Sequence, residues 1–175
     1  MIETERLILR RWEERDRATF HAHCSDPVVM ENLGPLQSRE ETDALLDRQN
    51  GYYDSHGYCF WALERKADGV LLGFCGLKPG AEGTPIEGEV EIGWRLGAEH
   101  WGRGYARESA RASLDWAWNN GIQSVAAITT PGNVRSWGLM ERLGMIRARE
   151  DDFDHPHAIE QLRAHVTYRI ARPGR

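Results

Sequence analysis

The sequence feature that most constrains the fold is a change of hydrophobic period between residues 89 and 119. Residues 89–96 alternate apolar with polar or glycine positions, which predicts a β-strand. Over residues 105–119 apolar and small side chains recur at helical spacing, which predicts an amphipathic helix. Gly102 and Gly104 lie between the two patterns and permit a tight backbone turn. The stretch is therefore predicted to form a strand, a glycine-rich turn and a helix.

The turn at residues 102–107 has the chemistry of an anion site. The first N–H groups of a helix have no intrahelical partner and lie at the positive end of the helix dipole. Because Arg103 and Arg107 add positive charge beside them, the turn is a candidate cradle for a pyrophosphate. It lacks the GKS or GKT ending of a P-loop and the GxGxxG spacing of dinucleotide sites. The alternative is an ordinary strand-to-helix turn without a ligand.

Composition excludes several classes of protein. A chain of 175 residues is long enough for a proper core, and we expect a single domain over residues 1–175. The net charge of -5 gives no general affinity for nucleic acid, and no apolar run reaches membrane-spanning length. Cys24, Cys59 and Cys75 are widely spaced, which predicts reduced core thiols. Since the N-terminus does not read as a signal peptide, we expect a cytoplasmic protein.

The remaining patterns predict a mixed α/β domain around one sheet. Strands are predicted over residues 3–12, 58–64, 70–77, 89–96, 124–130, 145–154 and 162–170. Helices are predicted over residues 13–24, 38–55, 105–119 and 133–143. Ser38 and Glu41 fit a capping box at the start of the second helix. Residues 27–37 are expected to be irregular, and residues 78–88 are expected to form an exposed loop.

Four segments of the chain resemble the GNAT superfamily of acetyl-coenzyme A-dependent N-acetyltransferases. They read ETERLILRRW, LLGFCGL, EVEIGWRLGAEHWGRGYARESA and TTPGNVRSWGLMERLGM, and together with the element order they cover nearly the whole chain. They are most similar to the branch of the ribosomal-protein N-terminal (serine/alanine) acetyltransferases. The resemblance implies one GNAT-like α/β (α+β) domain, with a mixed, mostly antiparallel sheet of about seven strands and about four helices. It also implies acetyl-coenzyme A as cosubstrate and a primary amine as acceptor, either a protein N-terminus or a small amine.

The resemblance assigns coenzyme contacts to the strand and turn described above. Backbone amides of residues 102–106 would bind the pyrophosphate, and the backbone of residues 92–96 would pair with the pantetheine arm. The coenzyme-binding residues of this first segment are Ile92, Gly93, Trp94, Arg95, Leu96, Trp101, Gly102, Arg103, Gly104, Tyr105 and Ala106. Gly104 and Ala106 match the family's loop pattern, whereas Trp101 stands where glutamine or arginine is common. That departure removes one polar contact, and it leaves open a non-catalytic domain that binds coenzyme A or a partner.

The resemblance also assigns a second coenzyme segment, which contains Asn133, Ser136 and Arg142. These residues match the branch pattern N-x-x-S followed by a basic residue, Leu and Gly. Asn133 is expected either to hydrogen-bond the pantetheine amide or to cap its own helix. Ser136 lies one turn further on, where its hydroxyl can stabilise or protonate the leaving thiolate. Many superfamily members use a tyrosine as this acid, but no tyrosine occurs between Tyr105 and Tyr168.

Acetyl transfer also needs a neutral amine and a polarised thioester carbonyl. Glu91 is the leading candidate for the base, directly or through a water, provided that burial raises its pKa. Glu89 is the competing carboxylate, and the alternative for Glu91 is a solvent-facing side chain paired with Arg95. The backbone N–H near Trp94 could polarise the carbonyl oxygen. Because the cysteines lie outside both coenzyme segments, direct attack in a ternary complex is preferred over a covalent cysteine intermediate.

Residues 152–166 carry the greatest density of ionisable groups, including His155, His157 and His165. Their spacing fits no usual zinc pattern, so no metal site is predicted. The segment is expected to line the acceptor side of the cleft, where His155 or His165 could orient the amine or carry a proton. A solvated loop is the alternative. The identity of the base, the oligomeric state and the use of a longer acyl donor stay open, although the resemblance allows a homodimer.

Overall fold

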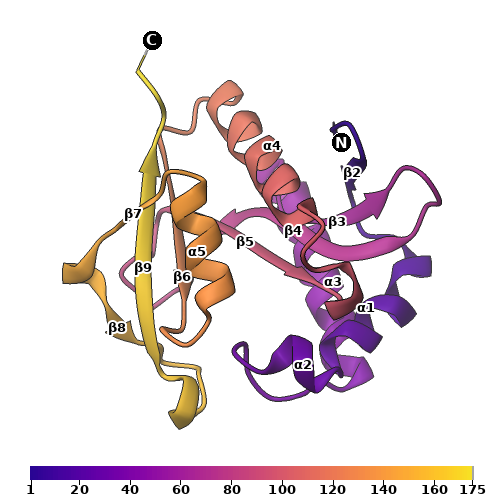
Figure 1. Cartoon of the computed structure of the whole chain (residues 1–175), viewed down its shortest axis with the longest axis horizontal. Coiled ribbons are helices and arrows are strands. Elements are labelled where there is room, and N and C mark those ends of the chain that lie inside the picture. Colours follow the sequence, from indigo (N-terminus) through magenta and orange to yellow (C-terminus); the bar gives the residue numbers. More distant parts are fainter. Residues whose placement is uncertain (175) are drawn as a thin grey trace.

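Nine β-strands form one sheet with helices packed on its faces in the computed structural model, which describes residues 1–174 (Figure 1). The strands are β1 (Ile2–Glu3), β2 (Leu7–Arg10), β3 (Phe60–Arg65), β4 (Leu71–Pro79), β5 (Val90–Leu96), β6 (Ser124–Thr129), β7 (Ile146–Arg147), β8 (Phe153–Asp154) and β9 (Ala164–Ala171). The helices are α1 (Arg17–Cys24), α2 (Pro27–Met30), α3 (Arg39–His56), α4 (Tyr105–Asn119) and α5 (Val134–Arg142). Short 3-10 turns occupy Glu14–Asp16, Ala98–His100, Arg149–Asp151 and Glu160–Leu162.

The strand order is β1-β2-β3-β4-β5-β6-β9-β7, and β8 pairs with β9. Within residues 1–174 all strand pairs are antiparallel except β5 and β6, which run parallel. The predicted mixed, mostly antiparallel α/β fold is therefore confirmed. The strands number nine rather than about seven, and the α-helices five rather than about four, across the described part of the chain.

Local hydrogen bonds explain these differences in number. The predicted strand 3–12 is divided because the Thr4 hydroxyl accepts a 3.0 Å bond from the Leu7 N–H and closes a turn between β1 and β2. The predicted strand 145–154 is divided by the 3-10 turn at 149–151, where the Asp151 carbonyl accepts a 2.7 Å bond from the Thr167 hydroxyl. Residues 27–37 are not wholly irregular, since the Asp26 carboxylate caps the short helix α2.

Two hydrophobic cores lie on opposite faces of the sheet. Successive residues of β3 alternate between them, with Phe60 and Ala62 in one core and Trp61 and Leu63 in the other. The first core packs against α1 and α3, and the second packs against α4 and α5. Helix α4 approaches the sheet closely because it presents small side chains there, which are fully buried: Ser109, Ala110, Ser113 and Ala117. This close packing fixes the N-terminal turn of α4 relative to β5.

Other local predictions are met in part. The capping box of Ser38 and Glu41 is formed at the start of α3, and the helix ends at Gly57 in the left-handed conformation. The loop at residues 78–88 is not simply exposed, since β4 extends to Pro79 and the Ile86 side chain is fully buried. No helix within residues 1–174 is long and apolar enough to cross a membrane.

Candidate active site

Strands β5 and β6 separate shortly after they meet. Across the described residues β5 and β6 are in register only at Glu91 and Ala126. On its other side, every residue of β5 pairs with β4, up to Leu96 opposite Gly73. Figure 1 shows that β5 and β6 run in diverging directions. The edge of β5 over residues 93–96 that faces β6 therefore has no partner strand in the region described. An extended ligand with amide groups can hydrogen-bond to such an edge, as an added strand does.

A glycine turn leads from this open edge into helix α4. Gly102 and Gly104 have φ of 73° and 82°, in the left-handed region where side chains are unfavourable. Gly104 is the N-cap of α4, and its carbonyl accepts the first helical bond from the Glu108 N–H at 3.0 Å. The amides that precede this bond have no intrahelical partner, and the side chains of Arg103 and Arg107 are exposed beside them. The predicted anion cradle thus has the required backbone geometry.

Trp101 connects the glycine turn to its surroundings. Its indole N–H donates a 2.9 Å hydrogen bond to the carbonyl of Leu96 at the end of β5. The guanidinium of Arg135, in the first turn of α5, lies 4.6 Å from the centre of the indole ring. The residue that departs from the family pattern therefore ties the first predicted coenzyme segment to the second.

Arg6 holds the turn from the other side. Its guanidinium lies 4.7 Å from the ring centre of Tyr105 and donates a 3.0 Å bond to the Arg103 carbonyl. The same side chain forms an ion pair of 2.6 Å with Glu108, which also accepts a 2.6 Å bond from the Thr4 hydroxyl. Sequence reasoning missed this residue, because the contact joins the N-terminal segment to a helix about a hundred residues later.

Asn133 caps helix α5. Its side-chain oxygen accepts a 3.3 Å bond from the Ser136 N–H, so the capping alternative is realised. The cap uses only the oxygen, and the NH2 group of the same side chain remains able to donate. Ser136 is half-buried in the first turn of the helix, and Arg142 is exposed in the last turn.

Glu91 is buried and paired with a lysine. Its side chain is 10% exposed and accepts a hydrogen bond from the Lys78 ammonium, which lies directly opposite on β4. Burial raises the pKa of Glu91, and the positive charge of Lys78 opposes this rise. The alternative of a solvent-facing carboxylate paired with Arg95 is wrong, since Arg95 instead reaches the thiol of Cys24 at 3.1 Å.

Glu89 has a different environment. Both of its carboxylate oxygens accept bonds from Arg169, at 2.8 to 3.1 Å. Arg169 also pairs with Asp151, so it joins the start of β5 to β9 and the 3-10 turn. Each carboxylate oxygen of Glu89 therefore already has a hydrogen-bond partner within the fold.

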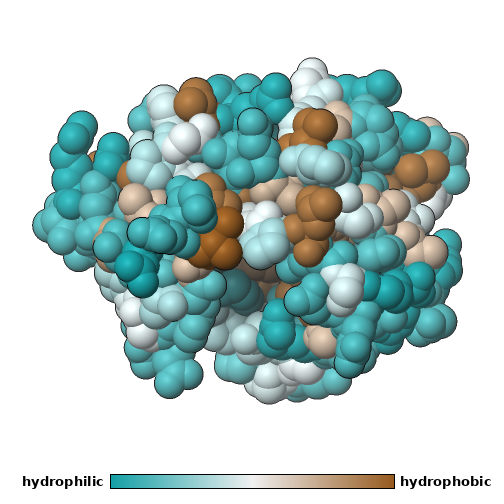
Figure 2. All heavy atoms as spheres, turned by 90° about the horizontal axis from the view of Figure 1, so that it is seen from below, coloured by the Kyte–Doolittle hydropathy of each residue, from teal (hydrophilic) through white to brown (hydrophobic). Residues whose placement is uncertain are grey.

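The three histidines of the 152–166 segment come together at a pocket of about 150 Å³. The rings of His155 and His165 have centres 4.9 Å apart, and those of His155 and His157 are 6.0 Å apart. The other residues that line the pocket are Leu33, Gly34, Pro35, Thr130, Ala158, Ile159 and Leu162. Figure 2, which views this end of the molecule from below, shows hydrophobic side chains on either side of a hollow.

The histidine pocket is within electrostatic reach of Lys78, the partner of Glu91. Burial lowers the pKa of His155, and the charges of His165, His157 and Lys78 lower it further. Burial also lowers the pKa of His165. The segment is thus not merely a solvated loop, because its histidines line a pocket.

Some residues of this site were not predicted from the sequence. Lys78 and Thr130 are the clearest examples, together with the loop of Leu33 to Pro35. For Lys78 the one available signal was the register of the β4–β5 pair, which places Lys78 opposite Glu91. Opposite residues of neighbouring strands lie close together. Nothing in the local patterns indicated that residues 33–35 would meet the histidines.

Comparison with known proteins agrees with this geometry. The family described as "Acetyltransferase (GNAT) domain" matches residues 6–146. The protein YkkB of Bacillus subtilis (strain 168), itself described as uncharacterized, is 36% identical over 146 residues, which cover 81% of this chain and 83% of the relative.

Two solved structures share the fold. The ribosomal-protein-S5-alanine acetyltransferase of Vibrio fischeri superposes with a TM-score of 0.74 at 15% identity, over 98% of both chains. The spermidine N-acetyltransferase of Vibrio cholerae, solved with CoA and spermine, superposes with a TM-score of 0.73 at 19% identity, over 96% of both chains. The structures confirm the fold, and the family match, which spans most of the sequence, confirms the expected family: the chain is an acetyltransferase that belongs to the GNAT family.

Proposed function

We propose that this acetyltransferase transfers the acetyl group of acetyl-coenzyme A to a primary amine by direct attack in a ternary complex. The observation that carries the proposal is the opening between β5 and β6, with the glycine turn on its coenzyme side and the Glu91–Lys78 pair at its base. Two substrates can enter from different sides and meet where the strands separate. In the reaction the amine nitrogen bonds to the thioester carbon, and the carbon–sulfur bond breaks.

The coenzyme would occupy the two segments that flank the opening. The free amides of residues 104–107 and the charges of Arg103 and Arg107 suit a pyrophosphate. The unpaired edge of β5, over residues 93–96, suits the amides of the pantetheine arm, and the Trp94 N–H is the candidate donor to the thioester oxygen. The NH2 group of Asn133 is available to a pantetheine carbonyl while its oxygen caps α5.

Glu91 is the better candidate for the base. It is buried, its pKa is raised and it lies where β5 and β6 meet, so it can accept the proton that the amine loses. Glu89 is committed to Arg169 and is the weaker candidate. Ser136, in the first turn of α5, would protonate or hydrogen-bond the leaving thiolate.

Direct attack is supported by the state of the cysteines. Cys24, Cys59 and Cys75 are fully buried and free. Burial raises the pKa of Cys59 to about 12 and that of Cys75 to about 11. Because the thiolate is the nucleophile, none of these side chains is suited to form an acetyl-cysteine intermediate. Free buried thiols also support the expected cytoplasmic location.

The pocket favours a compact acceptor with an apolar group beside its amine. Among the described residues, none that lines the pocket carries a carboxylate, and burial lowers the pKa of His155 and of His165, so these two side chains are neutral at pH 7. A polycation would find no counter-charge on these walls. A protein N-terminus or a small amine with an apolar side group fits better than a polyamine.

The test is release of coenzyme A thiol from acetyl-coenzyme A with a panel of amines. A short peptide with a free N-terminus and an arylalkylamine represent the compact class, and spermidine represents the polyamines. Thiol release with the compact class above the spermidine rate would support the proposal. Coenzyme binding without thiol release from any amine would contradict it and favour the non-catalytic alternative.

A further inference from the structure

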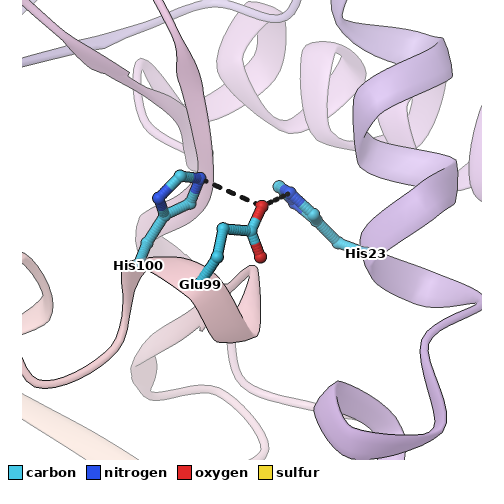
Figure 3. Close-up of side chains that lie close together, drawn as sticks. All are labelled: His23, Glu99 and His100. Atoms are coloured by element: carbon cyan, nitrogen blue, oxygen red, sulfur yellow. Dashed lines mark ion pairs between the residues drawn. The ribbon is translucent and has the colours of Figure 1, made fainter.

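A second group of ligand-type side chains lies away from the histidine pocket. His23 extends from the last turn of α1, and Glu99 and His100 belong to the 3-10 turn at Ala98–His100 (Figure 3). The Nε2 atoms of His23 and His100 lie 3.7 and 3.3 Å from one carboxylate oxygen of Glu99. One ligand atom from each of the three residues falls within 4.8 Å of the other two.

Both imidazoles are buried, and that of His23 lacks an adequate partner. His23 is 5% exposed and His100 is 8% exposed. The Nδ1 atom of His23 is buried and has no hydrogen-bond partner among the described residues. The 3.7 Å separation from Glu99 exceeds the length of a normal hydrogen bond, so Nε2 is also poorly satisfied. A ligand beside Glu99 would give Nε2 the partner it lacks, whereas Nδ1 lies on the other side of the imidazole ring and would not contact that ligand.

Gly97 leaves the space in which the side chains of His23 and Glu99 approach each other. A Cβ atom at this position would lie 2.6 Å from the Nε2 of His23 and 2.7 Å from a carboxylate oxygen of Glu99. Any larger residue would therefore push these two ligand atoms apart. Glu99 is the exposed member of the group, with 62% of its side chain accessible, so the cluster is open to solvent on this side.

We propose that His23, Glu99 and His100 bind a zinc ion. Two imidazoles and one carboxylate are a common ligand set for zinc, with a fourth position left to water. Metal–ligand bonds of about 2.0–2.1 Å in a tetrahedron place neighbouring ligand atoms roughly 3.3 Å apart. The separations of 3.3 and 3.7 Å to Glu99 are near this value, and the exposed carboxylate can move to complete the set.

The position of the site gives the ion a structural role. Trp101, which directly precedes the glycine turn, follows His100, and His23 lies on a different element, α1. Zinc would join α1 to the segment that presents the turn, much as a cross-link does. The ion takes no part in the transfer reaction. The prediction that no metal is bound considered only residues 152–166, and the ligands found here come from distant parts of the sequence.

The test is zinc binding by the whole chain after dialysis against a chelator, measured by competition with a metal-sensitive dye. We expect one equivalent of zinc to bind and to raise the Tm by mass action. Glu99→Gln and His23→Ala should each weaken binding by at least about tenfold. Because Glu99 is exposed, Glu99→Gln keeps the fold and remains informative if His23→Ala does not.

The histidine pocket supplies the matched control. The double variant His155→Ala/His165→Ala removes the other imidazole cluster and should still bind one equivalent of zinc. Cobalt in place of zinc should show the absorption of a tetrahedral site in this variant and lose it in Glu99→Gln. Absence of a bound equivalent in the wild type would overturn the proposal. Undiminished binding by Glu99→Gln, or binding lost only in the pocket variant, would overturn it as well.

Discussion

Lys78 and Glu91 lie directly opposite each other on β4 and β5 and form an ion pair whose carboxylate is buried. The pair stands at the point where β5 still touches β6, just before the two strands separate. Removing a charged pair from water at this position costs free energy, and apolar residues in the same space would avoid that cost. Its retention is explained if Glu91 must be available as a base while Lys78 limits the rise of its pKa.

Glu91→Gln should lower kcat about 10²- to 10⁴-fold, the range typical of a lost general base. A base acts when deprotonated, so the wild-type rate should rise with pH through the raised pKa of Glu91, and this limb should vanish in the variant. Lys78→Met removes the charge that lowers this pKa, and the limb should move to higher pH. The measurement is the pH profile of kcat/KM.

Glu89→Gln is the matched control for that prediction. It breaks the bonds to Arg169 and should reduce stability while the pH limb of kcat/KM stays in place. If Glu89→Gln removes the limb and Glu91→Gln does not, the assignment of the base is wrong.

Trp101→Gln restores the polar residue that is common in the family and should nevertheless weaken coenzyme binding. The variant loses the bond to Leu96 and the stacking with Arg135, together worth about 1–2 kcal/mol. That loss corresponds to about a five- to thirtyfold higher Kd for acetyl-coenzyme A, measurable by calorimetry. Trp118 lies in the last turn of α4, the helix that follows the glycine turn. Trp118→Gln should therefore leave the Kd for acetyl-coenzyme A unchanged. An unchanged or lower Kd for Trp101→Gln would show that the indole has no such role.

Asn133→Asp separates the two roles open to Asn133. Aspartate keeps an oxygen acceptor for the Ser136 N–H, so the cap and the Tm should be preserved, but it has no NH2 to donate to the coenzyme. We expect a several-fold higher KM for acetyl-coenzyme A with little change in Tm. Asn133→Ala loses both functions and should also cost about 1 kcal/mol of stability. Equal KM values for the wild type and Asn133→Asp would leave Asn133 as a cap alone.

Those parts of the fold that depend on local pattern were predictable from the sequence. The glycine turn, the capping box of α3 and the helix after Asn133 each follow from residues within one or two turns of one another. The family resemblance supplied the sheet and the coenzyme segments in the same way, through short motifs in order.

The rest depends on contacts between distant segments. The partner of Glu91 was expected to be Arg95, two residues along the same strand, but the cross-strand neighbour Lys78 takes that place. The interruptions near Thr4 and Asp151 arise from single side-chain hydrogen bonds that no hydrophobic period reveals. His23 and His100 likewise meet only because α1 packs beside the end of β5.

Glu108→Gln should destabilise the protein in a pH-dependent way. Burial alone would raise the pKa of Glu108, but hydrogen bonds from Thr4 and Arg6 outweigh it and lower the pKa. A carboxyl whose pKa is lower in the folded state contributes its stability above the unfolded value, about 4.3, and loses it as pH falls through the folded pKa. We expect the free energy of unfolding of the variant to be about 1–2 kcal/mol lower than that of the wild type at pH 7. This difference should shrink below about pH 4, as measured by denaturant unfolding.

The control for this prediction is Asp115→Asn on the same helix. Asp115 is exposed and forms no ion pair with the described residues, so its replacement should leave the unfolding free energy nearly unchanged at both pH values. A pH-independent difference between wild type and Glu108→Gln would mean that the charge of Glu108 is not the source of the stabilisation.

Ser136→Ala tests the fate of the thiolate. The Ser136 hydroxyl is half-buried in the first turn of α5, and its removal leaves the leaving sulfur without a proton donor. We expect kcat to fall about tenfold or more, because a positioned acid typically contributes at least that, while the KM for acetyl-coenzyme A changes little. Ser136→Thr keeps a hydroxyl at the same position and should recover most of the rate. Steady-state kinetics of thiol release distinguish the outcomes. If the alanine variant is as fast as the wild type, solvent rather than Ser136 protonates the thiolate.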